Sequence, residues 1–435
     1  MAVYSFAVIF VLVFSFIPVI GTQRFEKREN SCVIVILIML SLFSYHYGYK
    51  YSAFYGYYNL INQKIKNEMM VHNIKNGEGV ENRFYQDSVV DYFDPEIQTK
   101  NELIPEKPNV ILIFAEGLSQ SIVDDEREIM HNMKFYEDNS TCFTGYYNHT
   151  FATYRGILGQ LYSGYQLSDL DCNPLPSLQS ILADQGYNTA FINVEPYNGD
   201  FSSYTKNLGF GEVITNTDKV DGNVKSISDK DAFELLFDSA IEYEQKEEPF
   251  FISVYTFGTH VTLGSPDEVY GDGQDDELNK FYNLDYQFGE FMHKFNESQL
   301  YNNTVIVLTA DHATYQDDAF NTAFPNYERY HQEIDEIPFF IFYARNSARH
   351  VSVGGRNSLD LAPTVLDFLN ISAPNSFLGS SLFSESAVNE WEYCFTDANQ
   401  MCSTMNRSIS QLEGESLKNF EDLLQDYYTV VRLAK

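Results

Sequence analysis

The chain has 435 residues, which is long for one ordinary domain but suits one large α/β domain with further segments attached. Its net charge of −33 excludes nucleic acid as a natural partner, because so acidic a surface repels polyanions. The 32 Tyr and 35 Phe residues either pack in the core, which is their ordinary role, or line a groove that stacks on sugar rings.

Two uncharged apolar stretches open the chain, Ala2–Ile20 and Ser31–Gly48. Each has roughly the length of about 20 residues that a helix needs to cross a bilayer. The loop between them contains three basic residues, Arg24, Lys27 and Arg28. We therefore predict a transmembrane helical hairpin at 1–48 with a cytoplasmic loop, in the plasma or inner membrane, and a periplasmic or extracellular domain. A cleaved signal peptide is the alternative for the first stretch, but it lacks a charged n-region and a small-residue cleavage site.

Residues 49–107 are predicted to connect this hairpin to the domain. Tyr49–Val71 is aromatic, weakly basic and helix-like, as is typical of a segment at the membrane interface. Asn73–Lys107 contains glycines and prolines and few apolar runs, which indicates a linker.

From 108 to 383, short apolar strands alternate with helical patterns. Strands are expected at 109–114, 189–194, 249–256, 303–309 and 337–343, and helices at 177–185, 229–243, 277–296 and 360–369. This alternation predicts an α/β domain with a mostly parallel sheet sandwiched by helices. In the tail, 384–435, we expect an antiparallel edge strand at Glu390–Met401 and an amphipathic helix at Ser410–Leu433.

The first strand, NVILIF, ends at Glu116 in the run NVILIFAEGLS. Further on, Thr153 precedes apolar residues at helical spacing, which places its hydroxyl at a helix N-terminus. The helix dipole there favours an alkoxide and an incoming phosphate. Thr150, three residues upstream, is the alternative nucleophile.

The most informative stretch is NTVIVLTADHATY, in which an apolar strand delivers Asp311 and His312 side by side. Open α/β sheets place ligand sites and metals at the carboxyl ends of their strands. Taken alone, the pair equally fits an N-capping Asp beside a partly buried His. Two strands that each end in oxygen or nitrogen ligands instead predict one shared metal.

The order of Glu116, a Thr at a helix start, His260 after a strand and then Asp-His resembles the alkaline phosphatase and sulfatase superfamily. The resemblance is closest to the membrane-anchored lipoteichoic acid synthases and phosphoethanolamine transferases, and it covers roughly residues 108–383. Two recurrent structural phrases support it, Ser228–Asp231 and Asn357–Leu366 followed by Leu378-Gly379.

The resemblance implies one divalent metal, Mn, Mg or Zn, held by Glu116, Thr153, Asp311 and His312. It makes Thr153 the nucleophile and His260 a group that bonds a phosphate oxygen or protonates the leaving group. Arg155, His260 and His331 would contact substrate, although a solvent-facing His before a strand describes His331 equally well.

The chain departs from its relatives at two places. Lipoteichoic acid synthases hold glycerol phosphate with a His and a Trp-Asn-Arg-Asp run, where this chain has Asn193 and Tyr197–Asp200 without the Arg. Sulfatases proper need a Cys or Ser in a C/S-x-P-x-R signature, and Cys142 in TCFTG has neither the Pro nor the Arg.

The implied reaction is transfer of a phosphoethanolamine- or phosphoglycerol-type group from a phospholipid donor to a surface glycan or glycolipid, through a phospho-threonine. A sulfatase-like phosphodiesterase or ester hydrolase is the alternative enzyme, and a non-catalytic envelope scaffold is the alternative from another class. All four metal positions are filled, which argues against the scaffold. A membrane tether favours a lipid-borne donor, and hence transfer.

Four of the five cysteines follow the predicted hairpin, an even number consistent with two disulfides in an oxidising compartment. Of the three possible pairings we predict Cys142–Cys172 and Cys394–Cys402, with Cys32 free.

Overall fold

The protein is described by a computed structural model that covers residues 82–88, 105–166, 172–219, 226–260, 267–327, 329, 331, 333–384, 387, 389–397 and 400–434. The chain divides into two units, Met1–Gly79 and Val80–Lys435, and every described residue belongs to the second. The hairpin predicted at 1–48 and the interfacial helix after it lie outside the described residues. Within those residues, no helix has the length and apolar character needed to span a membrane.

An eight-stranded sheet with the order β4-β3-β5-β1-β6-β7-β2-β8 forms the centre of the second unit. Its strands are β1 Asn109–Ala115, β2 Thr141–Thr144, β3 Asn188–Ile192, β4 Glu212–Ile214, β5 Phe250–Tyr255, β6 Thr304–Ala310, β7 Phe339–Phe342 and β8 Arg349–Ser352. β7 runs antiparallel to its neighbours β6 and β2, and the other pairs in this sheet are parallel. Every residue of β1, β5, β6 and β7 is buried, as expected of strands covered on both faces.

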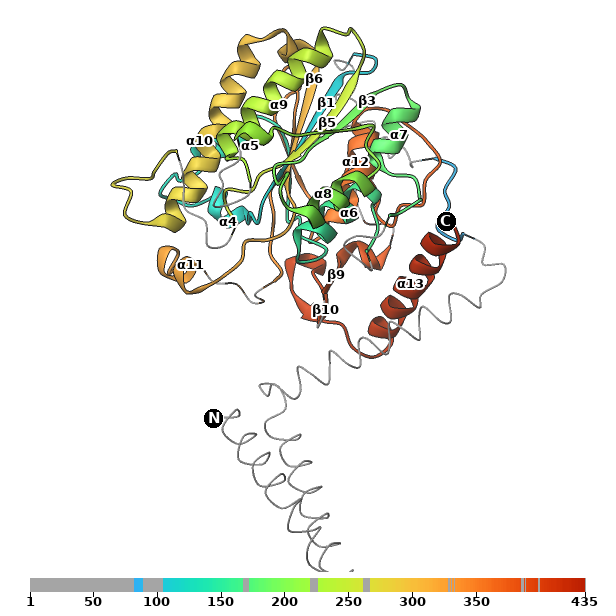
Figure 1. Cartoon of the computed structure of the whole chain (residues 1–435). Coiled ribbons are helices and arrows are strands. Elements are labelled where there is room, and N and C mark those ends of the chain that lie inside the picture. Colours follow the sequence, from blue (N-terminus) through green and yellow to red (C-terminus); the bar gives the residue numbers. More distant parts are fainter. Residues whose placement is uncertain are drawn as a thin grey trace, which may run out of the picture. The chain divides into compact units, whose positions relative to one another are not determined.

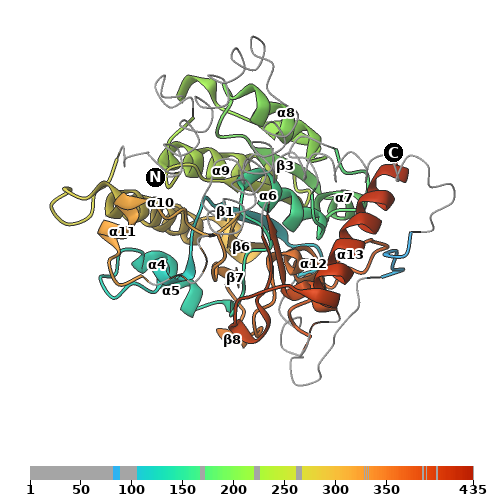
Figure 2. The same cartoon turned by 90° about the horizontal axis from the view of Figure 1, so that it is seen from below.

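Helices lie on both sides of the sheet (Figures 1 and 2). On one side α10 packs against α5 and α9, and on the other α12 packs against α6 and α7. These helices are α5 His131–Asp138, α6 Thr153–Tyr162, α7 Leu178–Asp184, α9 Asp229–Glu244, α10 Asp276–Glu297 and α12 Leu361–Phe368. Three further helices are α4 Gln120–Val123, α8 Gly199–Asn207 and α11 Asp318–Ala323. The architecture is the α/β sandwich that the sequence predicts.

Helix α10 shows why such segments form here. Asp275 caps it by accepting hydrogen bonds from the backbone N–H groups of Glu277 and Leu278. Its buried apolar residues then recur every three or four positions, which puts them on one face toward the sheet: Phe281, Leu284, Phe288, Phe291 and Phe295.

The C-terminal segment forms a second, three-stranded antiparallel sheet from β9 Cys394–Asp397, β10 Gln400–Ser403 and β11 Ser410–Gln411. The segment predicted as one edge strand, 390–401, therefore does not join the central sheet, whose edges are β4 and β8. Helix α13, Gly414–Leu433, matches the predicted tail helix. Its Phe420 packs edge-on against Tyr165 at 5.3 Å between ring centroids.

The predicted disulfides are not formed, because the four described cysteines are free thiols. Cys394 lies opposite Ser403 and Cys402 lies opposite Phe395, so the two thiols point to opposite faces of the small sheet. Cys142 is buried and donates to Glu137 Oε1 at 3.4 Å, whereas Cys172 is exposed. Cys32 lies outside the described residues.

Candidate metal centre

Glu116 and Asp311 leave the sheet side by side. β1 and β6 are parallel neighbours, and their last residues, Ala115 and Ala310, lie opposite each other. The next residue of each strand is therefore delivered to the same edge of the sheet. Glu116, Asp311 and His312 are all buried, and their ligand atoms lie within 4.8 Å of one another.

Backbone hydrogen bonds fix the orientation of these side chains. Asp311 Oδ1 accepts from the N–H groups of Gly117 and His312, both at 2.8 Å. His312 Nδ1 lies 2.8 Å from the carbonyl oxygen of Ala313, to which it donates, and this contact turns Nε2 toward the cluster. Nε2 faces Glu116 Oε1 at 3.6 Å and Asp311 Oδ2 at 3.5 Å.

The donor set fits a divalent cation. Burial and the adjacent Asp311 carboxylate raise the pKa of Glu116 well above its ordinary value, so two anions here repel each other without a cation. Asp311 Oδ2 is buried and accepts no hydrogen bond from any described residue, an arrangement that is unfavourable for a carboxylate unless a cation binds it. Carboxylate oxygens suit Mn and Mg, and imidazole suits Zn.

Thr153 is the first residue of α6, after the extended Ala152. Its Oγ1 donates to Glu116 Oε2 at 3.1 Å, which joins the hydroxyl to the cluster. Gly156 brings the helix this close, because a Cβ on it would lie 2.2 Å from the carbonyl oxygen of Asp311. The alternative nucleophile, Thr150, is buried in the preceding turn, where its carbonyl oxygen accepts from Asn148 Nδ2 at 2.8 Å.

The three predicted substrate residues, Arg155, His260 and His331, lie in different surroundings. His260 ends the turn after β5 and stacks on Phe257 at 4.8 Å between ring centroids. Arg155 forms an ion pair with Asp397 of β9 at 2.6 Å, so its guanidinium is already engaged by an acid. The backbone of His331 forms an isolated antiparallel β-bridge with Ile334, and partial burial of the imidazole lowers its pKa.

Sequence reasoning missed a buried polar pair beside the cluster. The Tyr255 hydroxyl donates to Glu195 Oε1, and Asn198 Nδ2 donates to Glu195 Oε2 at 3.0 Å. Burial raises the pKa of Tyr255, and the carboxylates of Glu195 and Glu116 raise it further. Glu195 follows the end of β3 closely, so the strand-end rule that found Glu116 could have found it too.

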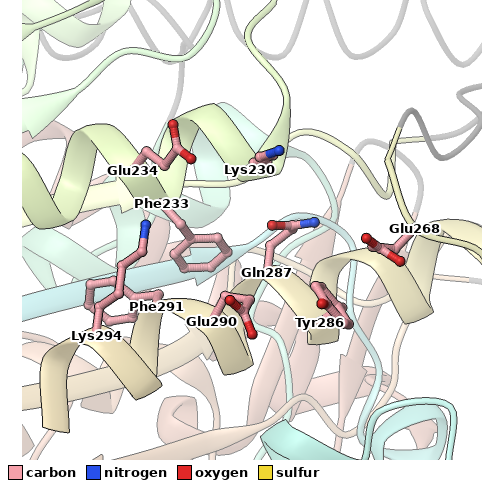
Figure 3. Close-up of a pocket in the computed structure, with 9 residues that line it drawn as sticks. All are labelled: Lys230, Phe233, Glu234, Glu268, Tyr286, Gln287, Glu290, Phe291 and Lys294. Atoms are coloured by element: carbon pink, nitrogen blue, oxygen red, sulfur yellow. The ribbon is translucent and has the colours of Figure 1, made fainter. Parts of the chain in front are cut away.

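A separate hollow of about 190 Å³ lies between α9 and α10 (Figure 3). Acidic, basic and aromatic side chains line it together: Lys230, Phe233, Glu234, Glu268, Tyr286, Gln287, Glu290, Phe291 and Lys294. This lining includes no predicted site residue, so the hollow is distinct from the metal centre.

The family of the chain follows from its match to a sequence model. The model of the sulfatase family matches residues 108–371. The chain belongs to the sulfatase family. The chain lacks the C/S-x-P-x-R signature of sulfatases proper.

Several solved structures of low sequence identity share the fold of this chain. A protein of the alkaline phosphatase superfamily from Vibrio parahaemolyticus is 16% identical with a TM-score of 0.62, over 86% of this chain and 95% of its own. The lipoteichoic acid synthase LtaP from Listeria monocytogenes is 16% identical with a TM-score of 0.62, over 83% and 97%. BT4656, in complex with D-glucosamine-2-N,6-O-disulfate, is 13% identical with a TM-score of 0.51, over 75% and 98%. At these identities the likeness shows the fold, which confirms the alkaline phosphatase-like architecture.

Proposed function

We propose that this protein is a metal-dependent phosphotransferase of the cell envelope. It moves a phosphoethanolamine- or phosphoglycerol-type group from a phospholipid to a surface glycan or glycolipid through a phospho-threonine at Thr153. The observation that carries the proposal is the Thr153 hydroxyl, which lies at the start of α6 and 3.1 Å from Glu116 in the buried cluster.

Each side chain has a role that its position supports. A divalent metal held by Glu116, Asp311 and His312 would lower the pKa of the Thr153 hydroxyl and offset phosphoryl charge. Thr153 Oγ1 forms a bond to phosphorus while the bond from phosphorus to the lipid alcohol oxygen breaks. His260 protonates that oxygen or bonds a phosphoryl oxygen. In the second half, an acceptor hydroxyl attacks phosphorus and releases Thr153.

Transfer to a sugar is favoured over hydrolysis by two observations. LtaP, which shares the fold over 83% of this chain, is by name a synthase. Next to the cluster, the Phe151 ring lies 4.9 Å from the His312 ring and 6.2 Å from the half-exposed Tyr315 ring, measured between centroids. Aromatic rings of this kind stack well on pyranose faces. The predicted hairpin at 1–48 would hold the domain beside a lipid donor outside the cytoplasm.

The hydrolase is the second candidate, and membership of the sulfatase family favours it. A scaffold role is disfavoured, because a scaffold has no need of a hydroxyl that is hydrogen-bonded to Glu116 within a buried acidic cluster.

Intact-mass spectrometry of the purified full chain tests the proposal. With Mn²⁺ and vesicles of phosphatidylethanolamine or phosphatidylglycerol, one vesicle type should give an adduct on Thr153, and its added mass names the group. Thr153→Ala should give none, whereas Thr150→Ala should retain it. Octyl glucoside added as acceptor should discharge the adduct to a phosphorylated glucoside. Release to water alone would make the protein a hydrolase, and no adduct with either lipid would contradict the proposal.

A further inference from the structure

The turn after β5 connects the metal centre to His260. The Glu116 N–H donates to Thr256 Oγ1 at 3.1 Å, and Thr259 Oγ1 donates to the Glu116 carbonyl oxygen at 2.5 Å. The His260 N–H donates to the carbonyl oxygen of Phe257 at 3.1 Å, and the two rings stack. The 256–260 turn therefore forms hydrogen bonds with the backbone of Glu116, a predicted metal ligand, and also contains His260, the predicted substrate histidine.

Asp229 of α9 holds this turn from outside. It is the first residue of the helix, which Ser228 caps, and its side chain is 1% exposed. Asp229 Oδ1 accepts from the N–H of Phe257 at 3.2 Å and from the N–H of Gly258 at 2.9 Å. A Cβ on Gly258 would lie 2.2 Å from Asp229 Oδ2, so the turn and the carboxylate fit only because residue 258 is glycine.

The buried position of the Asp229 carboxylate is energetically unfavourable. Its Oδ2 is buried and has no hydrogen-bond partner among the described residues. Burial raises the pKa of Asp229 to about 6, against the two backbone hydrogen bonds, which lower it. Unfavourable buried groups of this kind persist where the surrounding structure uses them.

We propose that Asp229 is a positioning residue of the active site, which fixes the 256–260 turn and thereby the approach of His260 to the phosphoryl group. The inference rests on the function proposed above, in which His260 contacts the phosphoryl or leaving group. It assigns no chemistry to Asp229 itself, which touches the turn and not the metal ligands.

Two substitutions at Asp229 separate positioning from bulk stability. Asp229→Ala removes the acceptor of both hydrogen bonds, whereas Asp229→Asn keeps an oxygen in the Oδ1 position. Gly258→Ala disturbs the same contact from the turn side. Asp231→Asn is the matched control, because Asp231 lies two residues further along α9 and pairs with Lys219 at 3.1 Å instead of the turn.

The assay is release of 4-nitrophenol from bis(4-nitrophenyl) phosphate by the full-length protein with Mn²⁺, corrected for the folded fraction. A displacement of about 1 Å near reacting groups lowers rates by about 100-fold, so we expect a loss of that order in kcat for Asp229→Ala and Gly258→Ala. KM and the Mn²⁺ Kd should change less than about threefold, since Asp311 and His312 stay in place. The kcat of Asp229→Asn should be at least about tenfold higher than that of Asp229→Ala, and the kcat of Asp231→Asn should match that of the wild type.

A double-mutant cycle shows whether Asp229 acts through His260. In a His260→Asn background, Asp229→Ala should cost little more activity, because the group that it positions is already gone. A full additional loss, or a folded Asp229→Ala with wild-type kcat, would overturn the proposal. Amide hydrogen exchange of Phe257 and Gly258 gives a test without turnover: it should quicken in Asp229→Ala and return toward the wild-type rate in Asp229→Asn. If the wild type is inactive but exchange behaves in this way, the proposed function fails and the positioning contact stands.

Discussion

Gly156 of α6 makes the contact on which the geometry of the metal centre depends. A Cβ placed on it would lie 2.2 Å from the carbonyl oxygen and 2.9 Å from the carbonyl carbon of Asp311, where ordinary contact begins at 3.4 Å. In Gly156→Ala, the helix and the Asp311 backbone must therefore separate by about 1 Å. Overpacking of this kind costs about 1–3 kcal/mol, and the better helix propensity of Ala offsets about 1 kcal/mol.

The activity of Gly156→Ala should fall much further than its stability. Thr153 moves with the helix and Asp311 with the strand end, so the proposed nucleophile and a proposed metal ligand are displaced relative to each other. A misplacement of about 1 Å lowers rates by about 100-fold. Urea unfolding should then show a loss of at most about 2 kcal/mol, while adduct formation on Thr153 slows by about two orders of magnitude.

Gly199→Ala is the control for this experiment. Gly199 is the first residue of α8, and no atom lies within 4 Å of a Cβ placed on it. Its replacement should leave adduct formation unchanged and stability equal or higher by about 0.5–1 kcal/mol. If Gly156→Ala were as active as Gly199→Ala, the packing of α6 against Asp311 would not set the geometry of the site.

Three other outcomes follow from the structure. Thr153→Ala should abolish turnover and lower stability by only about 1 kcal/mol, because it removes one hydrogen bond, the one to Glu116. If Thr150→Ala were the inactive variant instead, the nucleophile would be Thr150. Burial lowers the pKa of His149 to about 3 from 6.5, so the native state binds fewer protons than the unfolded state. Its contribution to stability is complete well above pH 6.5 and is lost as pH falls toward 3, by about 2 kcal/mol between pH 6.5 and 4.5. Urea unfolding of His149→Gln should lack this part of the pH dependence, and an unchanged pH dependence would refute it. Thiol alkylation of the unfolded, unreduced protein should label all four described cysteines, which are Cys142, Cys172, Cys394 and Cys402. If any two of them were protected from the reagent, they would form a disulfide.

The main strands and helices could be predicted from the sequence because their signals are local. β1, β5 and β6 are buried on both faces and read as continuous apolar runs, and each lies within two residues of its expected range. β2, β4 and β8 were not predicted, because each has only three or four residues. β4 and β8 also lie at the edges of the sheet, where side chains are only partly buried and polar residues interrupt the run.

The clustering of Glu116, Asp311 and His312 was predictable for the same reason, and the surroundings of this cluster were not. Glu116 and the Asp311-His312 pair each follow their strand directly, so strand ends alone predict that they meet. The ion pair of Arg155 joins it to Asp397, 242 residues later, and no local pattern shows such a partner. An even number of cysteines says nothing about which face of a hairpin each thiol occupies.

Anomalous diffraction from crystals grown with Mn²⁺ would show whether the Thr153 hydroxyl binds the metal. We expect one strong peak at which Glu116, Thr153, Asp311 and His312 all place a ligand atom at about 2.0–2.6 Å. A peak elsewhere, or a manganese ion bound to the two carboxylates and the imidazole with the Thr153 hydroxyl turned away, would contradict a metal-activated threonine nucleophile.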